Sequence, residues 1–344
     1  MTTQLELGLD TFGDVTHGAD GKPLPHAQVI RNVVDEGILA DELGISFFGV
    51  GEHHRADFAV SAPETVLAGI ATRTSQIKLG SAVTVLSSDD PIRVYQRFAT
   101  VDALSNGRAE IILGRGSFTE SFPLFGHDLS RYELLFNDKL SLINALLKEE
   151  KVTWQGETRP PLKNTVVYPR PEGATIPTWI GVGGSPESVI RAASHELRMM
   201  LAIIGGAPSR FKPYVDLYHE AHEKMGTDPQ PIGVHSPGHV GPTDEEAKER
   251  FFPGYKAMHD GIGASRGWPP LTREAFEREI SHGALTVGAP ETVARKIANT
   301  VKTLGLGRFD LKYSAGPVSH DLMMDSIRLY GEQVIPMVRD MVEG

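Results

Sequence analysis

The sequence contains no cysteine, and this absence removes two kinds of structure at once. Disulfide bonds are excluded, and so are metal sites built on thiolate ligands. Positive charge is also scarce, because 34 Lys and Arg residues face 44 Asp and Glu residues and leave a formal net charge of −10. A nucleic-acid partner is therefore not expected, since phosphates are bound by basic surfaces.

Long hydrophobic runs are missing as well. No stretch approaches the roughly 20 apolar residues that cross a bilayer, and the first ten residues lack the basic and apolar regions of a signal peptide. We therefore expect no membrane partner and a cytoplasmic location. The length of 344 residues and the hydrophobic content of 40% suit one large α/β domain.

Strand and helix patterns alternate along the chain. Short apolar runs are followed by amphipathic segments, several of which begin with proline, a residue suited to the first turn of a helix. Such alternation is typical of parallel strands joined by helical crossovers. The eight predicted strands begin near Leu5, Phe47, Ile77, Ala109, Thr178, Arg198, Ile232 and Phe309.

Eight β/α units predict a (β/α)8 TIM barrel that occupies residues 1–344 as a single domain. A doubly wound open sheet is the alternative, but no GxGxxG motif follows the first strand. The segment 241–288 is too long for a simple connection, so we expect a partly helical insertion at the carboxyl-terminal face of the barrel. Residues 159–177 are rich in proline and predict a long loop.

Chemically unusual residues gather where the predicted strands end. In a (β/α)8 barrel these ends open onto one face, which carries the active site. The sequence therefore predicts one shared site rather than several isolated motifs. The strand ends in question are Glu52-His53-His54, Ala82-Val83-Thr84, Gly114-Arg115-Gly116-Ser117 and Gly183-Gly184-Ser185-Pro186.

The stretch GGSPES, residues 183–188, has the features of an anion site. Its glycines permit close approach to the backbone, and the helix that follows Pro186 offers free N–H groups and a partial positive charge. Ser185 and Ser188 add hydroxyl donors, and Arg115 can complete the site. Phosphate is the expected occupant in a barrel, although Ser185 taken alone fits equally well as a helix N-cap.

His53 and His54 are adjacent, so on a strand they point to opposite sides and only one faces the mouth. A metal site is not expected, because hydrolytic metal barrels use an alternating His-x-His pair with both rings on one side. One histidine is therefore expected to be structural. The other is expected to act as an acid, a base or a hydrogen-bond donor beside a cofactor.

Five motifs occur in one order along nearly the whole chain. They are a strand ending in EHH, GSAVTVLSSDDPIRVYQRFATVDALSNGR, IILGRGS, GVGGSPESVIRAA and VGAPETVARKIANTVKTLGLGRFDL. On these motifs the chain resembles the bacterial luciferase-like flavin-dependent monooxygenase family. Gly114 and Gly184 stand where luciferase itself has a cysteine and an acidic residue, so the resemblance is to the superfamily and not to light emission.

The resemblance implies a barrel that binds FMN in its reduced form, FMNH2, supplied by a separate NAD(P)H flavin reductase. O2 would be activated as a flavin C4a-peroxide that oxidises a small organic substrate. An apolar substrate is expected from four aromatic residues, which core packing explains equally well: Phe118, Phe122, Phe125 and Trp268. His53 would be the catalytic residue, as a hydrogen-bond partner or base near C4a. A cis peptide is implied at Ala82-Val83. The implied cofactor-binding residues are Glu52, Ala82, Val83, Arg115, Gly183, Gly184, Ser185 and Ser188.

Three other functions stay open at this point. The same superfamily includes dehydrogenases and reductases that use the deazaflavin F420. Some relatives of luciferase bind flavin without turnover. A metal-dependent hydrolase is the remote fourth choice. The resemblance also implies a homodimer formed through the helices that follow the first three strands.

Overall fold

Eight parallel strands close into a ring in the computed structural model, which describes residues 4–344. Each strand pairs with the next one, and the last strand pairs with the first. The predicted (β/α)8 barrel is therefore confirmed with all eight of its strands. They are β1 (Glu6–Thr11), β2 (Phe47–Val50), β3 (Lys78–Ser81), β5 (Ala109–Gly114), β8 (Thr178–Val182), β9 (Arg198–Ala202), β10 (Ile232–Val240) and β12 (Arg308–Lys312).

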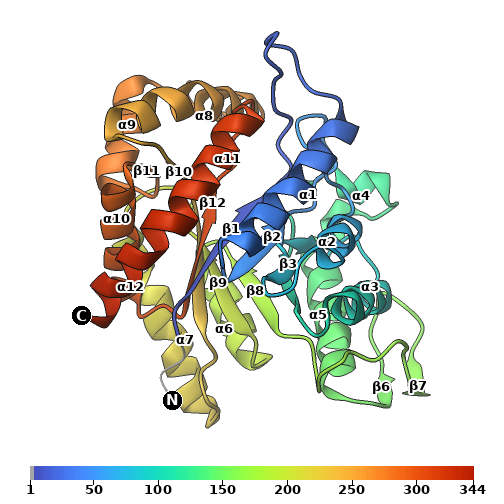
Figure 1. Cartoon of the computed structure of the whole chain (residues 1–344). Coiled ribbons are helices and arrows are strands. Elements are labelled where there is room, and N and C mark those ends of the chain that lie inside the picture. The colour runs from blue at the N-terminus through green and yellow to red at the C-terminus, as the bar shows by residue number, and fades with distance from the viewer. Residues whose placement is uncertain (1–3) are drawn as a thin grey trace.

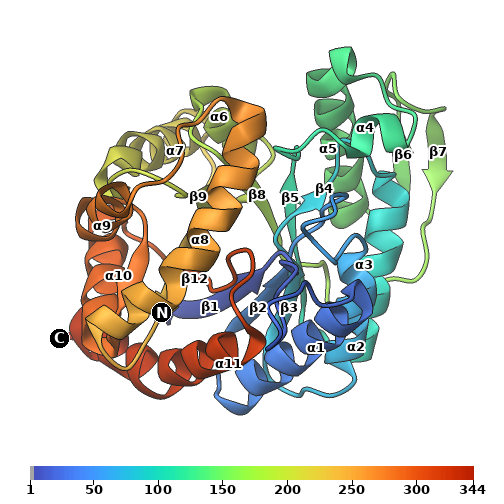
Figure 2. The same cartoon turned by 90° about the horizontal axis from the view of Figure 1, so that it is seen from above.

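Helices surround the ring of strands, as Figures 1 and 2 show from two directions. Pro63, Pro91 and Pro186 each occupy the first turn of a helix, as predicted. Asp90 caps the second of these helices, because its carboxylate accepts a 2.8 Å hydrogen bond from the Ile92 amide. The helices around the barrel are α1 (His26–Glu42), α2 (Pro63–Ala71), α3 (Pro91–Ser105), α5 (Tyr132–Lys148), α6 (Pro186–Ser194), α7 (Lys212–Met225), α10 (Pro290–Leu304), α11 (His320–Leu329) and α12 (Ile335–Glu343).

The third predicted strand, residues 77–86, is divided in two. β3 ends at Ser81, and β4 (Thr84–Val85) follows after a break and pairs with β5. The Ala82–Val83 peptide between them is cis, as the resemblance implies. Apolar and β-branched residues continue through the break, which is why the sequence predicts a single strand there.

The predicted long loop over residues 159–177 is wrong in part. β6 (Val152–Trp154) and β7 (Leu162–Thr165) form an antiparallel ribbon outside the barrel. Most side chains of β7 are polar, so it lacks the apolar alternation of a half-buried strand. The helical segment that ends the chain is interrupted between α11 and α12 by the π-helical turn η3 (Tyr330–Val334). The remaining short elements are α4 (Ser121–Leu124), η1 (Leu129–Arg131) and η2 (Pro208–Phe211).

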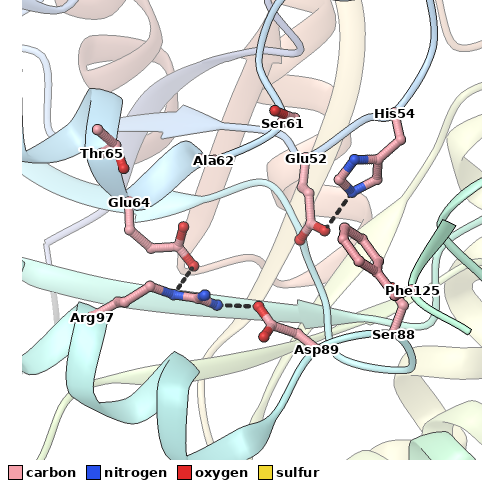
Figure 3. A pocket seen from close by; sticks show the side chains of 10 residues that line it. All are labelled: Glu52, His54, Ser61, Ala62, Glu64, Thr65, Ser88, Asp89, Arg97 and Phe125. Atoms are coloured by element: carbon pink, nitrogen blue, oxygen red, sulfur yellow. Dashed lines mark hydrogen bonds and ion pairs between the residues drawn. The ribbon is translucent and has the colours of Figure 1, made fainter.

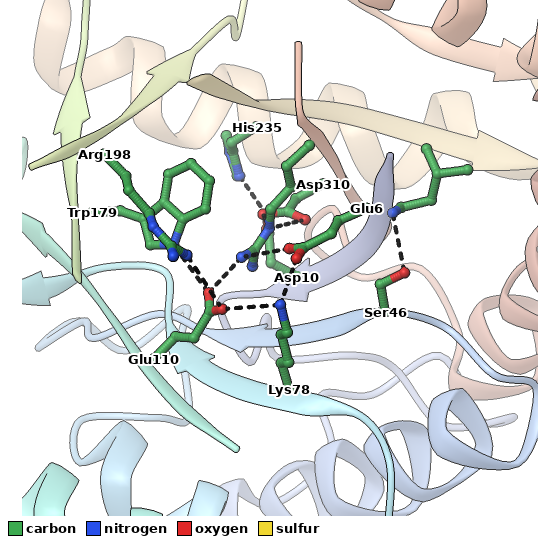
Figure 4. Close-up of polar contacts among 11 residues, drawn as sticks. Glu6, Asp10, Ser46, Lys78, Glu110, Trp179, Arg198, His235 and Asp310 are labelled. Carbon is green, nitrogen blue, oxygen red and sulfur yellow. Dashed lines mark hydrogen bonds and ion pairs between the residues drawn. The ribbon is translucent and has the colours of Figure 1, made fainter. Parts of the chain in front are cut away.

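Charged side chains fill the amino-terminal half of the barrel interior (Figure 4). Arg308 is fully buried, with Nη1 2.6 Å from Glu110 Oε2 and Nε 2.9 Å from the Asp310 carboxylate. Its guanidinium carbon lies 3.4 Å from the centre of the Phe47 ring, and Trp179 Nε1 donates to Glu110 at 3.0 Å. Buried charges are tolerated when they are paired in this way. This end of the barrel is therefore filled, and a ligand must enter from the carboxyl ends of the strands.

The segment 241–288 connects β10 to α10 and carries α8 (Asp244–Arg266), α9 (Arg273–His282) and β11 (Thr286–Gly288). β11 pairs with the end of β10. Figure 2 shows α8 lying across one side of the barrel. At the end of this helix Arg266 donates a 3.2 Å hydrogen bond to the Ser117 carbonyl, in the loop after β5. The segment thus contacts a loop at the carboxyl-terminal face. None of the helices within residues 4–344 combines the length and the apolar character needed to cross a bilayer.

Candidate active site

Four inward-facing residues form the floor of the barrel mouth. Beneath them lies an apolar cluster that consists of Phe47, Ile112, Trp179 and Met200. Val83 packs on this cluster, and Gly181 and Ala202 share the inner face with Trp179 and Met200, two residues earlier in their strands. His235 lies opposite Ala202 in the register of β9 and β10. Val83, Gly181, Ala202 and His235 are all partly exposed, so the mouth is open down to this level.

His53 faces the mouth just after β2. Its ring lies among those of Phe12, Phe58 and Phe118, with centroid distances of 4.6, 4.3 and 5.4 Å. Nδ1 is buried and has no hydrogen-bond partner among the described residues. Burial lowers the pKa of His53 from 6.5 to about 3, against the opposing charge of Asp14. The ring is therefore neutral near pH 7, which suits a hydrogen-bonding role better than that of a base.

Glu52 and His54 lie on the opposite side of the chain from His53, as the alternation predicts. His54 Nε2 and Glu52 Oε1 are 2.9 Å apart, and Glu52 Oε2 accepts a 2.8 Å hydrogen bond from the Val85 amide. Both carboxylate oxygens are thus engaged within the chain. Glu52 orients His54 and β4, and the expected contact between Glu52 and a cofactor in the mouth is not supported by this geometry.

A separate cavity of about 290 Å³ opens beside Glu52 and His54, between β2, α2 and α3 (Figure 3). Arg97 crosses it and pairs with both Glu64, at 3.3 Å, and Asp89. Burial raises the pKa of Glu64, against the lowering effect of the Arg97 charge. These ion pairs hold the start of α2 against α3, on the side of the chain that His53 does not face.

Val83 lies against the end of β5 and against β8. A Cβ atom built on Gly114 would lie 2.3 Å from Val83 Cγ2, so only glycine fits at position 114 without a rearrangement. A Cβ atom on Gly181 would lie 3.6 Å from Val83 Cγ1, which is an ordinary contact. Ala82 is buried beneath. Of the two residues joined by the cis peptide, Val83 is therefore the more exposed, and contact of Ala82 with a cofactor stays a prediction.

Arg115, Ser185 and Ser188 come together at the amino end of α6, as predicted. Ser185 Oγ accepts a 3.3 Å hydrogen bond from the Ser188 amide, and Arg115 Nη2 donates to Ser188 Oγ at 3.3 Å. Gly184 has φ of +101°, a conformation that strongly favours glycine. A Cβ atom on Gly183 would meet nothing within 4 Å, so the backbone there is open to a ligand.

The electrostatics of this helix terminus favour an anion. Arg115 forms an ion pair with Glu133, whose other oxygen lies 3.0 Å from Arg191 Nη2. Two guanidinium groups thus share one carboxylate. Glu187, in the first turn of α6, offsets one of these charges from an exposed position, and the partial positive charge of the α6 amino terminus remains on the side of an anion. A phosphate group is the ligand that this combination of hydroxyl, amide and guanidinium donors suits best.

Four polar side chains in and beside the mouth were not among the predicted site residues. His235 and Asp10 form one pair, with His235 Nδ1 2.6 Å from Asp10 Oδ2. Lys312 and Asp14 form the other at 3.1 Å, and the Lys312 ammonium lies 4.5 Å from the centre of the Phe12 ring. A signal was present for three of them, because Asp10, His235 and Lys312 interrupt the apolar strands LGLDTFG, PIGVHS and RFDLKYSAG. Within residues 4–344 no group of three or more His, Cys, Asp or Glu side chains is arranged to hold a metal ion.

Comparison with known sequences places this geometry in context. A family profile described as luciferase-like monooxygenase matches residues 11–307. The alkanal monooxygenase alpha chain of Photorhabdus luminescens is 22% identical over 347 residues, which cover 91% of this chain and 92% of that one. The uncharacterized protein y4vJ of Sinorhizobium fredii is 31% identical over 160 residues, and the match spans just under half, 46%, of each chain.

Solved structures share the fold over almost their full lengths. The monooxygenase RslO1 of Streptomyces bottropensis has a TM-score of 0.86 at 20% identity and covers 96% of this chain and 99% of its own. The oxygenating constituent of 3,6-diketocamphane monooxygenase from Pseudomonas putida, in complex with FMN, has a TM-score of 0.78 at 18% identity, with coverage of 97% and 98%. An F420-dependent secondary alcohol dehydrogenase has a TM-score of 0.74 at 19% identity, with coverage of 98% and 100%.

Proposed function

Because the chain belongs to the luciferase-like monooxygenase family, we propose that it is a two-component monooxygenase that uses FMNH2 and O2 to oxidise a small organic substrate. The observation that carries the proposal is the meeting of two features at one face. An anion site lies at the start of α6. It adjoins the barrel mouth, whose floor consists of partly exposed residues, among them the small residues Gly181 and Ala202. FMN needs both features, one for its phosphate and one for its flat ring system.

The residues present fit FMN. Arg115, Ser185, Ser188 and the backbone at Gly183 and Gly184 would hold the phosphate, since they combine donors, positive charge and an open backbone. Val83 would lie next to the ring system. Reduced flavin, when bound, supplies the electrons with which one atom of O2 is transferred to the substrate.

His53 and its aromatic neighbours would shape the reaction space. The rings of Phe12, Phe58 and Phe118 exclude water from the His53 side of the mouth, which protects a reactive site from side reactions. His53 is neutral near pH 7, and its Nε2, unlike the buried Nδ1, is accessible and has no hydrogen-bond partner within residues 4–344. It can therefore exchange a hydrogen bond with the cofactor without bringing a charge.

Several features of this proposal stay predictions from the sequence. A separate NAD(P)H flavin reductase would supply FMNH2, and two copies of the chain would associate through α1, α2 and α3. We also keep the predictions of one domain over residues 1–344, a cytoplasmic location and an apolar substrate. The exposed side chain of Trp268, next to Arg266 at the end of α8, supports an apolar wall on one side of the mouth.

Anaerobic titration with FMNH2 and, separately, with reduced F420 tests the proposal. Tight binding of FMNH2, weakened by Arg115→Gln, is expected. Tight binding of reduced F420 alone would instead make the chain an F420-dependent dehydrogenase or reductase of the same fold. Flavin binding without any turnover, together with unchanged properties in His53→Ala, would indicate a non-catalytic flavin-binding protein.

A further inference from the structure

His235 and Asp10 form a hydrogen-bonded pair at the floor of the barrel mouth. His235 Nδ1 lies 2.6 Å from Asp10 Oδ2, and Asp10 is 1% exposed. A buried carboxylate at this distance holds the imidazole proton on Nδ1. The other ring nitrogen, Nε2, is then left as a hydrogen-bond acceptor.

The second nitrogen of His235 is open to the mouth. Nε2 has no hydrogen-bond partner within residues 4–344 and is not buried, and the side chain as a whole is 12% exposed. The His235 ring stacks on Phe12 with a centroid distance of 5.7 Å and an interplanar angle of 9°, which fixes the plane of the ring. Phe12 also contacts His53, so two imidazoles flank one aromatic ring.

The two histidines lie in different electrostatic environments. His53 lies in an apolar environment that lowers its pKa to about 3, mainly through burial. A proton gained by His235 would instead be compensated by the Asp10 carboxylate, which is already hydrogen-bonded to the ring. The arrangement of a base held by a carboxylate is the one that proton-transfer enzymes use to orient a catalytic histidine.

The other charged groups around His235 have partners of their own. Asp310 faces it from β12, where the two are register partners, and accepts hydrogen bonds from Arg308. Lys312, farther along β12, is paired with Asp14. The third neighbouring strand, β9, contributes the apolar Ala202. Asp10 is therefore the charged group that acts on His235 directly.

We propose that His235 is a catalytic base, positioned by Asp10, for a flat organic substrate with a weakly acidic hydroxyl group, such as a phenol or an enol. The substrate O–H bond breaks, an N–H bond forms at His235 Nε2, and the electron pair stays on the substrate oxygen. The anion that results is richer in electrons and reacts more readily with an oxygen donor. The imidazolium holds the proton until product or solvent takes it back. The proposal rests on the proposed function and names its substrate class.

The test uses 4-nitrophenol, a flat phenol whose anion absorbs visible light and whose neutral form does not. The full chain is titrated with it at a fixed pH about one unit below the pKa of the free phenol. A fixed pH is needed because burial raises the pKa of Asp310 to about 7, so this neighbour titrates in the same range. We expect the wild-type protein to bind the probe as its anion, and His235→Gln to reduce the visible band of the bound probe by about tenfold or more.

A second readout needs no variant. Nitrogen-15 NMR of labelled histidine should show a proton on Nδ1 of His235 in the free protein and a second proton, on Nε2, when the probe binds. In the protein without the probe, Asp10→Asn should give a mixture of the two neutral tautomers of His235. It should also weaken the visible absorbance of the bound 4-nitrophenol anion. The exposed His219 and Asp216, on α7, supply the matched controls His219→Gln and Asp216→Asn, which should change nothing.

Either of two results would overturn the inference. One is a wild-type protein that does not bind the probe or binds it only as the neutral phenol. The other is an undiminished anion band in a folded His235→Gln variant. The proposed function can fail independently of this inference. A protein that binds the probe as its anion but binds neither FMNH2 nor FMN would support His235 as a base and contradict the monooxygenase proposal.

Discussion

Val83 Cγ2 occupies the space that a side chain at position 114 would need, because a Cβ atom built on Gly114 would lie 2.3 Å from it. This contact joins the break between β3 and β4 to the end of β5, one residue before Arg115. The floor of the mouth and the anion site are therefore mechanically linked. Luciferase itself has a cysteine at the position of Gly114. The Val83 side chain leaves no space for a cysteine side chain at this position.

Gly114→Ala is expected to lower the free energy of unfolding by about 1–3 kcal/mol, the usual cost of overpacking a filled interior. Val83 must move or the end of β5 must shift. Urea denaturation monitored by circular dichroism measures the effect. The double variant Val83→Ala/Gly114→Ala removes the 2.3 Å contact and leaves the Val83 Cβ atom 3.1 Å from the new methyl group, so it relieves most of the clash and should be more stable than Gly114→Ala alone. A double variant that is less stable by the sum of both costs would show that the contact is not the cause.

Gly183→Ala should behave in the opposite way, because a Cβ atom there meets nothing within 4 Å. Its free energy of unfolding should stay within about 0.5 kcal/mol of the wild-type value. Its affinity for FMN should nevertheless fall, since the new methyl group would stand on the backbone that the phosphate approaches. Calorimetric titration with FMN checks this, and an unchanged affinity would move the phosphate away from Gly183.

Arg115→Gln should weaken FMN binding by about 10- to 100-fold, which corresponds to the roughly 1.5–3 kcal/mol of a hydrogen bond to a charged group. Riboflavin has the same ring system but no phosphate, so its affinity should change little. The ratio of the two dissociation constants therefore isolates the phosphate contact. A variant that loses FMN and riboflavin equally would indicate damage to the ring site instead.

Two further variants control that measurement. Glu133→Gln removes the carboxylate that competes for Arg115, so FMN should bind more tightly by a few-fold. Arg31→Gln removes an exposed arginine on α1 that contacts only Gln28 among the described hydrogen bonds, and it should leave both affinities unchanged.

The pH dependence of stability should carry a signature of His53. Its folded pKa of about 3 lies below the ordinary 6.5, chiefly because of burial. The unfolded chain therefore binds the proton first as the pH falls, so the stability from this group is complete above about pH 6.5 and is lost as the pH approaches 3. The wild-type protein should lose up to about 2 kcal/mol from this group between pH 7 and pH 5.

His53→Gln removes that contribution and should flatten the curve by a similar amount. The measurement is the free energy of unfolding in urea at pH 7, 6 and 5. His239, whose pKa burial lowers to about 4, contributes in the same direction in both proteins and cancels in the comparison. Parallel curves for the wild-type protein and the variant would mean that folding does not lower the pKa of His53.

The barrel was predictable because its signals are local. Each strand is a short apolar run, each helix is amphipathic, and the polar residues at the strand ends cluster only if the strands are parallel. The opposite directions of His53 and His54 follow from the two-residue period of an extended chain. The meeting of Arg115 with Ser185 and Ser188 follows from the adjacency of β5 and β8.

The inner charges were not predictable in the same way. Asp10 and His235 are 225 positions apart, and their contact depends on closure of the ring through β12. A polar residue within an apolar strand indicates that its side chain has a polar partner inside the barrel. The sequence of that strand does not identify which residue the partner is. Glu52 shows the converse case, in which a motif predicts a contact that stays untested. Its place in a motif suggested a cofactor contact, whereas its carboxylate is already bonded to His54 and the Val85 amide.

The most direct test of the account is to load the protein with FMNH2 in the absence of oxygen and then admit air while recording the absorbance spectrum. We expect bound flavin to pass through a transient spectrum, distinct from those of reduced and oxidised FMN, before FMN appears, and His53→Ala to shorten the lifetime of this transient. Oxidation at the rate of free FMNH2 with no transient, or no binding of FMNH2 at all, would contradict the monooxygenase assignment.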